Sequence, residues 1–199
     1  MFQDKTEIEK ILAALGEQLD ALQTVIPELV VCGGSALNIL GFVNRTTKDV
    51  DVVAFAKSLP DGDMIISKAE PLPPALVEAA MKVGRDFNLP DNWLNPGPTS
   101  AVDFGLPEGL TKRVETKRYS TSLVIHFLSR YDQICFKLYA AADQGTGKHF
   151  NDLIALEPTA TELEEAARWS MTHDVSEGYR QTIKDLLKHM GHGDVTERL

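Results

Sequence analysis

The stretch VVCGGSALNILGFVNRTTKDVDVVAF, residues 30–55, decides the fold that the sequence predicts. A first apolar run ends in the glycine pair Gly33 and Gly34, and a second apolar run carries Asp49 and Asp51. Short apolar runs bounded by glycine or by polar segments are typical of buried strands. Charged side chains are rarely buried without a partner, so the two aspartates call for a functional explanation.

The segment SALNILGF between the two runs predicts a short helix, with Ser35 as its N-cap and Gly41 as its stop. Because Gly33 and Gly34 carry no Cβ, a phosphate group can approach their backbone closely. The N-terminus of the helix offers free N–H groups and the positive end of its dipole. The hydroxyl of Ser35 adds one more donor, so these three residues predict a phosphate cradle.

In a strand, residues i and i+2 point to the same face, so Asp49 and Asp51 are expected to project side by side. Two ionised carboxylates this close repel each other unless a cation compensates them. Mg²⁺, or Mn²⁺ in its place, prefers carboxylate oxygens together with substrate phosphates. Arg45 and Lys48 lie just before the aspartates and are expected to neutralise phosphate charge. The stretch thus predicts a site for a nucleoside triphosphate and its metal; an edge strand with solvated acids is the alternative.

Length and composition fit an ordinary globular protein. The chain has 199 residues, of which 43% are hydrophobic and 25% charged. Its two cysteines, Cys32 and Cys135, are far apart in apolar segments and are expected to be free thiols. The N-terminal residues lack the basic and then apolar pattern of a signal peptide, and no apolar run approaches a membrane span of about 20 residues. We therefore expect a cytoplasmic protein without a membrane partner.

The formal net charge of -9 disfavours loose, sequence-independent binding of nucleic acid. One segment, TKRVETKRYS, is locally basic through Lys112, Arg113, Lys117 and Arg118. A solvated loop or the edge of a hairpin accounts for it. The alternative is a contact for phosphate, for RNA or for an acidic partner.

The rest of the chain mixes strands and helices, which predicts an α/β (α+β) fold. We expect helices over residues 5–22, 73–87, 131–142, 150–156, 160–171 and 176–190, and strands over residues 28–34, 49–55 and 121–129. Residues 88–110 are rich in turn formers and predict a long loop or a set of short pieces. Thr161 and Glu164 have the spacing of a capping box. Residues 1–158 are expected to form the core and residues 159–199 a C-terminal helical extension packed on it.

The glycine pair followed by Asp49-Val50-Asp51 resembles the signature of the nucleotidyltransferase superfamily, which has the DNA polymerase β-like fold. The form found in this chain is most similar to bacterial AbiEii-type toxins and their uncharacterised relatives. The resemblance extends to ICFKLYAA, which carries Lys137, and to HFNDLIAL, which carries Asp152. It covers most of the chain, although its specific residues are few.

The resemblance implies a small mixed sheet flanked by helices, followed by C-terminal helices. It also implies that a nucleoside monophosphate moves from a nucleoside triphosphate to an acceptor hydroxyl, with release of pyrophosphate. Asp49 and Asp51 would bind Mg²⁺, Lys137 would touch the triphosphate, and Asp152 would serve the acceptor side or order Lys137. The acceptor would be an RNA such as tRNA, a protein or a small molecule, and a toxin-like role would imply an antitoxin partner.

The pattern departs from the superfamily at the third carboxylate that many members carry on a neighbouring strand. The predicted strand LVIHFL has His126 where the superfamily pattern leads us to expect an acid. Asp103 and Asp132 are candidates for this carboxylate, and Asp152 is a further one. If none of them reaches the site, the chain would be a catalytically inactive module that binds a nucleotide or a partner on the same scaffold.

Overall fold

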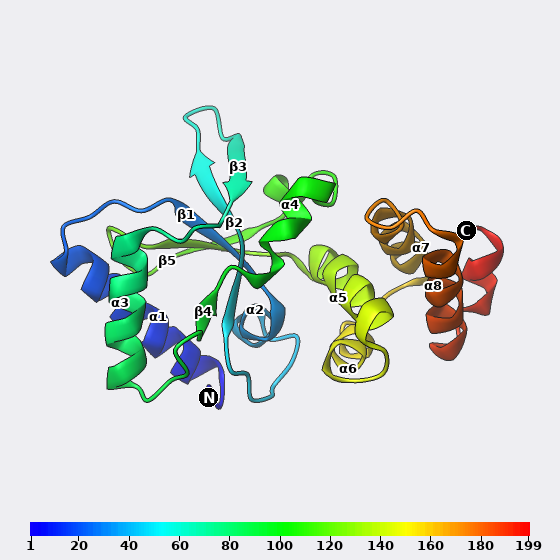
Figure 1. The fold of residues 1–199 in the computed structure, drawn as a ribbon, viewed down its shortest axis with the longest axis horizontal. Helices are drawn as coiled ribbons and strands as arrows, with labels where there is room; N and C mark the ends of the chain where they lie inside the picture. Colours follow the sequence, from blue (N-terminus) through cyan, green and yellow to red (C-terminus); the bar gives the residue numbers. More distant parts are fainter. The chain divides into compact units, whose positions relative to one another are not determined.

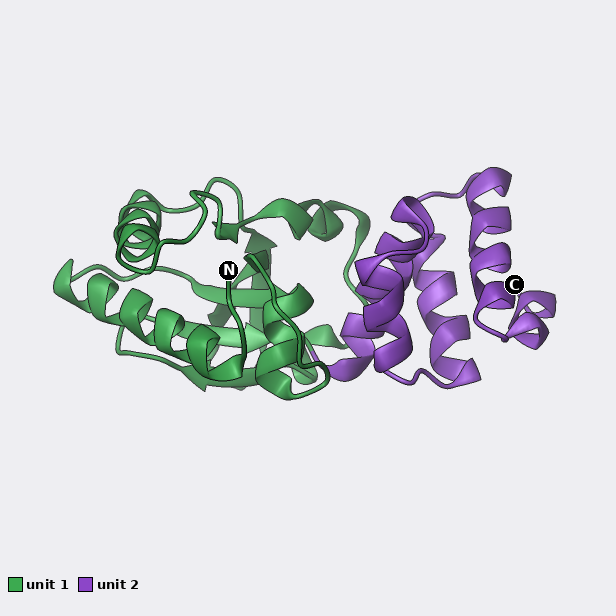
Figure 2. Cartoon of the chain, turned by 90° about the horizontal axis from the view of Figure 1, so that it is seen from below, with its two compact units in different colours: residues 1–128 green, residues 129–199 purple.

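The computed structural model describes all 199 residues, which divide into two compact units, 1–128 and 129–199 (Figures 1 and 2). Each unit has helices or strands packed around its own buried apolar residues. The boundary between the two units follows residue 128, whereas the expected domain boundary lies at residue 158. That boundary stays a prediction, because a compact unit is defined by contacts alone.

The first unit contains one sheet of six strands. These strands are β1 (Glu28–Cys32), β2 (Val50–Ser58), β3 (Met64–Lys68), β4 (Leu94–Asn95), β5 (Glu115–Arg118) and β6 (Val124–Phe127). The order is β3-β2-β1-β6-β5, and β4 pairs with β2 on the same side as β3 but at the other end of β2. β1 runs parallel to β6 and β2 parallel to β4, whereas the other pairs are antiparallel. The predicted small mixed sheet is therefore confirmed.

The first unit also contains four α-helices and two 3-10 turns, and helices cover the sheet (Figure 1). They are α1 (Lys5–Ala21), α2 (Gly33–Leu40), α3 (Pro74–Asp86) and α4 (Ala101–Phe104), with the 3-10 turns η1 (Gly97–Ser100) and η2 (Leu110–Lys112). The predicted helices over residues 5–22 and 73–87 are confirmed as α1 and α3. Asp4 caps α1 by accepting a hydrogen bond from Glu7 N at 3.0 Å, and Pro74 lies in the first turn of α3.

The core lies between one face of the sheet and the helices α1 and α3. The apolar side chains at helical spacing on α1 are all buried, namely Ile8, Ile11, Leu12, Leu15 and Leu19. They share one cluster with Val31 of β1, with Val50 and Val52 of β2, and with Ile125 of β6. Each such side chain contributes about 1.5–3 kcal/mol when it leaves water. This packing fixes the start of β2, the segment that carries Asp51.

A β-bulge sets how β2 meets β1. Val30 pairs with Ala54 but Val31 pairs with Val52, which leaves Val53 as the extra residue. Bulges bend a strand and re-aim its side chains. Beyond the bulge, Asp51 lies directly opposite Cys32, the last residue of β1. The carboxylate is thereby carried to the point where β1 ends and α2 begins.

The structure corrects two local expectations and adds an edge strand. Ser35 is not an N-cap, because α2 already begins at Gly33 and Cys32 occupies the capping position. Asp49 does not belong to β2, which begins at Val50. The edge strand β3 escaped prediction, because its short sequence lacks the alternation that marks a half-buried strand. Gly41, in contrast, ends α2 as predicted, with φ +81° in the left-handed region.

The second unit consists of helices. They are α5 (Arg130–Gln144), α6 (Lys148–Ala155), α7 (Ala160–Ser170), α8 (Glu177–His189) and the 3-10 turn η3 (Gly193–Glu197). α5 contacts α6, α7 and α8, and apolar residues such as Leu138, Leu163 and Leu187 are fully buried there. All four α-helices were predicted near these positions. No helix in either unit combines the length and the apolar character that crossing a membrane requires, and the cytoplasmic location stays a prediction.

The capping box of α7 is formed by Thr159 and Glu162, two residues before the predicted pair. Glu162 Oε2 accepts a hydrogen bond from Thr159 N at 2.8 Å, and Arg130 Nη1 donates to Glu162 Oε1 at 2.5 Å. Partial burial acts to raise the pKa of Glu162, but the hydrogen bonds from Thr159 and Arg130 outweigh it and lower the pKa from its ordinary value of 4.5. This carboxylate therefore links α5 to the start of α7 in its ionised form.

We predict that Glu162→Gln lowers the stability of the second unit by about 0.5 kcal/mol at neutral pH, because glutamine keeps an acceptor oxygen but loses the charge facing Arg130. A lowered pKa means that the carboxylate stabilises the fold fully above pH 4.5 and loses this effect as the pH falls through the folded-state pKa. The difference between the two proteins in urea unfolding should therefore shrink from pH 7 to pH 3. Glu177→Gln, in the first turn of α8, serves as the control. A difference independent of pH would contradict this account.

Candidate functional site

The centre of the candidate site is the contact between Gly33 and Asp51. A Cβ atom added to Gly33 would collide with Oδ2 of Asp51 and would lie 3.3 Å from its carboxyl carbon. Gly33 also has φ +78°, a conformation that residues with a side chain rarely adopt. Glycine is thus required here for two independent reasons. Its absence of a side chain lets a carboxylate lie against the N-terminus of α2, where the helix dipole favours negative charge.

Gly34 is required by a second close approach. A Cβ on Gly34 would lie 2.7 Å from Thr47 Oγ1 and 3.0 Å from Arg45 Nη2. Side chains of the chain itself therefore lie against both glycines. The sequence predicted the glycine pair for the close approach of a phosphate group. The structure adds this second reason for glycine, and the approach of a phosphate stays a prediction.

The loop between α2 and β2 is held in position by the buried side chain of Asn38. Its Nδ2 donates to the carbonyl oxygens of Gly34 and Arg45, both at 2.9 Å, and its Oδ1 accepts from Arg45 N at 3.2 Å. Further along the loop, Thr47 pairs with Phe2 through two backbone hydrogen bonds of 2.8 and 3.1 Å. The guanidinium of Arg45 is thereby fixed beside Gly34, whereas Lys48 is exposed. Sequence reasoning missed Asn38, although a buried amide in an apolar helix was a usable signal.

Asn95 of β4 approaches Asp51 from the other side. β4 pairs with β2 so that Asn95 lies beside Asp51, and Asn95 Nδ2 donates to Asp51 Oδ1 at 3.2 Å. Gly97 N donates to Asn95 Oδ1 at 2.9 Å, which fixes the orientation of the amide. Asn95 was not predicted, because its partner is 44 residues away and only the sheet brings the two together.

Trp93 anchors β4 next to the start of β2. It is 1% exposed, its Nε1 donates to Ala80 O at 2.9 Å, and its backbone oxygen accepts from Val50 N at 2.6 Å. Gly84 of α3 lets the indole ring approach closely, since a Cβ there would lie 3.2 Å from two of its atoms. Trp93 is therefore a core residue. Through this anchor, the core sets the position of Asn95 two residues later.

The donor atoms at the site fit a divalent cation with a phosphate group. Asp49 and Asp51 are only partly buried at the start of β2. The hydroxyl oxygen of Ser35, in the first turn of α2, is fully buried without a hydrogen-bond partner, which normally costs about 1–3 kcal/mol. The structure holds no group of three or more histidine, cysteine, aspartate or glutamate side chains arranged for a metal. Mg²⁺ is bound by one or two carboxylates together with water and substrate phosphates, so two carboxylates suffice.

His126, which stands where an acid was expected, and the candidate carboxylates Asp103 and Asp132 all have other partners. His126 of β6 lies 2.8 Å from Glu28 Oε2 through Nε2 and 2.7 Å from Thr116 Oγ1 through Nδ1. Asp103 of α4 forms an ion pair of 2.7 Å with Lys68. Asp132, in the first turn of α5, accepts a hydrogen bond of 2.6 Å from the hydroxyl of Ser129.

Lys137 and Asp152 form a buried ion pair within the second unit. Lys137 Nζ of α5 lies 2.8 Å from Asp152 Oδ2 of α6, and the two side chains are only 5% and 2% exposed. This is the geometry expected if Asp152 orders Lys137. The catalytic roles of both residues stay predictions.

The basic segment TKRVETKRYS forms η2 and the edge strand β5. Lys117 is engaged in an ion pair of 2.6 Å with Glu9 of α1. Because β5 is the edge strand of the sheet and pairs antiparallel with β6, the segment agrees with its interpretation as the edge of a hairpin.

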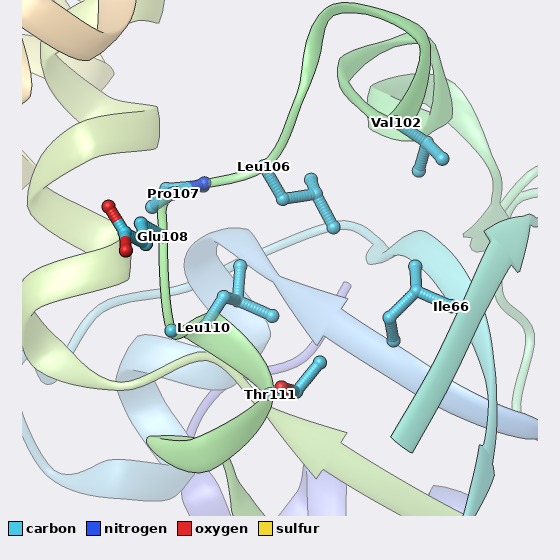
Figure 3. Close-up of a pocket in the computed structure, with 8 residues that line it drawn as sticks. Ile66, Val102, Leu106, Pro107, Glu108, Leu110 and Thr111 are labelled. Atoms are coloured by element: carbon cyan, nitrogen blue, oxygen red, sulfur yellow. The ribbon is translucent and has the colours of Figure 1, made fainter. Parts of the chain in front are cut away.

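A cavity of about 350 Å³ lies between β3, α4 and the following loop (Figure 3). Figure 3 shows the side chains of Ile66, Leu106 and Leu110 facing one another, with Glu108 pointing away from them. This lining is mainly apolar, and its polar side chains are those of Glu108 and Thr111.

The mixed sheet, the glycine pair against a strand carboxylate and the second carboxylate two residues before it define a nucleotidyltransferase-like protein. Residues 9–155 match the sequence model of a family described as nucleotidyltransferase of unknown function (DUF6036). The match covers well over half of the chain, so the chain belongs to this family. It crosses from the first compact unit into the second. No curated protein and no solved structure matches the chain. The closer relationship to AbiEii-type toxins stays a prediction.

We predict that Gly33→Ala destabilises the first unit more than Gly62→Ala does. Both glycines have positive φ, +78° and +88°, so each alanine costs about 1 kcal/mol for its backbone conformation. Only at Gly33 does the new Cβ also collide with Asp51, which adds about 1–3 kcal/mol. Urea unfolding of the two variants measures the difference. Equal losses of stability would show that Asp51 does not need the space beside Gly33.

We also predict that Lys137→Met lowers stability by about 3–5 kcal/mol, because it leaves the carboxylate of Asp152 buried without its cation. The double variant Lys137→Met/Asp152→Leu should recover most of this loss, since replacing both charges removes the unpaired group. Urea or thermal unfolding of the single and double variants is the measurement. A double variant no more stable than Lys137→Met would contradict the importance of pairing.

Proposed function

We propose that this protein is a Mg²⁺-dependent nucleotidyltransferase. It transfers a nucleoside monophosphate from a nucleoside triphosphate to an acceptor hydroxyl and releases pyrophosphate. The observation that carries the proposal is the contact of the Asp51 carboxylate with Gly33 at the N-terminus of α2. It brings a carboxylate and an anion-binding helix terminus together in one site. Membership in a family described as nucleotidyltransferase supports the reaction class.

Each residue near this contact has a role in the proposal. Asp49 and Asp51 hold the metal ion, Mg²⁺ or Mn²⁺, which when bound supplies Lewis-acid stabilisation of charge on the transferring phosphate. The N–H groups of Gly33, Gly34 and Ser35, with the Ser35 hydroxyl, bind the triphosphate. Its negative charge is neutralised by Arg45, which the Asn38 network holds beside Gly34, and by the exposed Lys48.

Two further roles come from the sequence resemblance, those of Lys137 and Asp152. In the proposal Lys137 touches the triphosphate, and the carboxylate of Asp152 orients its ammonium group. Asp152 serving the acceptor side is the other role considered for it. An RNA such as tRNA, a protein and a small molecule remain acceptors to test. A toxin-like role with an antitoxin partner rests on the sequence resemblance alone.

A second candidate function is a catalytically inactive module that binds a nucleotide or a partner. It is favoured by the other partners of the candidate third carboxylates, the ion pair of Asp103 with Lys68 and the hydrogen bond of Asp132 with Ser129. Such a module would bind a nucleoside triphosphate with Mg²⁺ but would release no pyrophosphate. Binding and turnover must therefore be measured separately.

The deciding test measures Mg²⁺-dependent binding of each nucleoside triphosphate by calorimetry, together with pyrophosphate release in the presence of candidate acceptors. We expect Asp49→Asn and Asp51→Asn each to lower pyrophosphate release at least about 100-fold, because each removes charge that faces the metal. Asp86→Asn, an exposed acid at the end of α3, is the matched control and should leave both measurements unchanged.

Three outcomes separate the alternatives. Binding that needs both Mg²⁺ and the two aspartates, without pyrophosphate release, supports the inactive module. Pyrophosphate release that persists in an Asp49→Asn/Asp51→Asn variant contradicts the site. Absence of metal-dependent binding of any nucleoside triphosphate contradicts both functions.

A further inference from the structure

A second cavity lies in the first unit, next to Asp51 on the β4 side. It has a volume of about 370 Å³, and we call it the Asn95 cavity. Polar side chains line it, namely Lys68, Glu70, Asn92, Asn95, Thr99 and Ser100. Cavities of this size hold small molecules or single chemical groups. Because Asn95 both lines the cavity and donates to Asp51 Oδ1, the cavity adjoins the proposed catalytic carboxylate.

The strand pairing gives Asp51 two distinct sides. On one side Asp51 lies opposite Cys32, so that its carboxylate contacts Gly33 at the N-terminus of α2. On the other side it lies beside Asn95 and the Asn95 cavity. A carboxylate that serves nucleotidyl transfer has to lie between the donor phosphate and the acceptor. Because the N-terminus of α2 binds the triphosphate in the proposed function, the acceptor is expected on the β4 side of Asp51.

The cavity is held open by hydrogen bonds within its own wall. Thr99, which is 3% exposed, accepts from Ala69 N at 2.7 Å through its Oγ1. Gly97 N fixes the amide of Asn95, and Trp93 anchors β4, the strand that carries Asn95. The wall is therefore built by the fold before any ligand arrives, which lowers the ordering cost of binding.

The charges at the cavity favour a cation. Lys68 Nζ donates to Asp103 Oδ2 at 2.7 Å, so its positive charge is compensated. Glu70 is exposed, and its negative charge also acts on Lys68. One ammonium group therefore faces two carboxylates, and Asp51, which Asn95 contacts, adds further negative charge next to the cavity. A phosphate-rich acceptor such as RNA would be repelled here, in keeping with the net charge of -9.

We propose that the acceptor is a small molecule with several hydroxyl groups and at least one positively charged amine, of the amino-sugar type, bound in the Asn95 cavity. The amine pairs with Glu70, while Asn92, Asn95 and Ser100 contact hydroxyl groups. This inference rests on the proposed nucleotidyl transfer and names its acceptor class.

The reaction balances with this acceptor. An acceptor hydroxyl oxygen forms a bond to the α-phosphorus of the nucleoside triphosphate. The bond from that phosphorus to the oxygen bridging to the β-phosphorus breaks, and pyrophosphate leaves with the electron pair. The hydroxyl proton is released to solvent. The product is a phosphodiester of the acceptor, and no oxidant or reductant is needed.

The test measures binding to the full chain without any nucleotide, by ligand-observed NMR and calorimetry. The probes are glucosamine, glucose and glucose 6-phosphate. They share the same sugar ring, but glucosamine is positively charged, glucose is neutral and glucose 6-phosphate is negatively charged. We expect glucosamine to bind most tightly and glucose 6-phosphate not to bind. Glu70→Gln should weaken glucosamine binding about fivefold, the value for one exposed charge pair, and added salt should reduce the effect.

Glu108→Gln is the matched control, because Glu108 is an exposed acid at the mainly apolar cavity of Figure 3 in the same unit. It should leave glucosamine binding unchanged, whereas Ser100→Ala should weaken it along with glucose binding. Equal affinity for glucosamine and glucose 6-phosphate, or no effect of Glu70→Gln, overturns the proposed acceptor class. So does the absence of binding by all three sugars.

The two proposals fail in distinguishable ways. If the acceptor class is wrong but the reaction is right, Mg²⁺-dependent binding of a nucleoside triphosphate persists and no amino sugar binds. If glucosamine binds and depends on Glu70 while no nucleoside triphosphate binds, the Asn95 cavity is an amino-sugar site and nucleotidyl transfer is wrong. Mass spectrometry of the product formed with glucosamine and a nucleoside triphosphate tests both proposals together. A nucleoside monophosphate adduct of glucosamine forms only if the reaction and the acceptor class are both correct.

Discussion

The contact between Gly33 and the carboxylate of Asp51 is the constraint on which the candidate site depends. It requires a residue without a Cβ that also adopts positive φ, and it requires β2 to enter the sheet in one register. The bulge that leaves Val53 unpaired sets that register. A shift by one residue would turn Asp51 to the other face of the sheet, where Val50 and Val52 pack in the core. The glycine, the bulge and the core thus specify a single position for the carboxylate.

The surrounding network turns this contact into a site with two sides. Asn38 and the Phe2–Thr47 pairing hold the loop that presents Arg45, whereas the core anchor Trp93 holds the strand that presents Asn95. Both supports are buried, and the groups they position are more exposed. Rigid elements thus hold polar groups around the contact, as a site for a phosphate-bearing ligand requires. The asymmetry between an anion-binding helix terminus and a polar cavity suggests a donor side and an acceptor side.

Much of the fold was predictable because the apolar periodicity of α1 and α3 and the apolar runs of β1 and β2 agree with local propensity. Predictions failed where local signals were weak or ambiguous. Ser35 has the chemistry of an N-cap, but the left-handed Gly33 starts α2 two residues earlier. The capping box of α7 lies at Thr159 rather than Thr161, since two Thr/Glu pairs with the same spacing overlap there. β3 was missed because pairing with β2, rather than its own sequence pattern, makes it a strand.

The sequence by itself determined that two carboxylates would follow a glycine pair at the start of a buried strand, because strand periodicity and the special backbone of glycine are local properties. The pairing of Lys137 with Asp152 could also be anticipated, since both lie on neighbouring helices of one segment. Only the tertiary structure decided what fills the space beside the glycines and which residue lies next to Asp51. The Asp51–Asn95 hydrogen bond spans 44 residues and exists because Trp93 is buried against α3, a long-range packing event that no local pattern records.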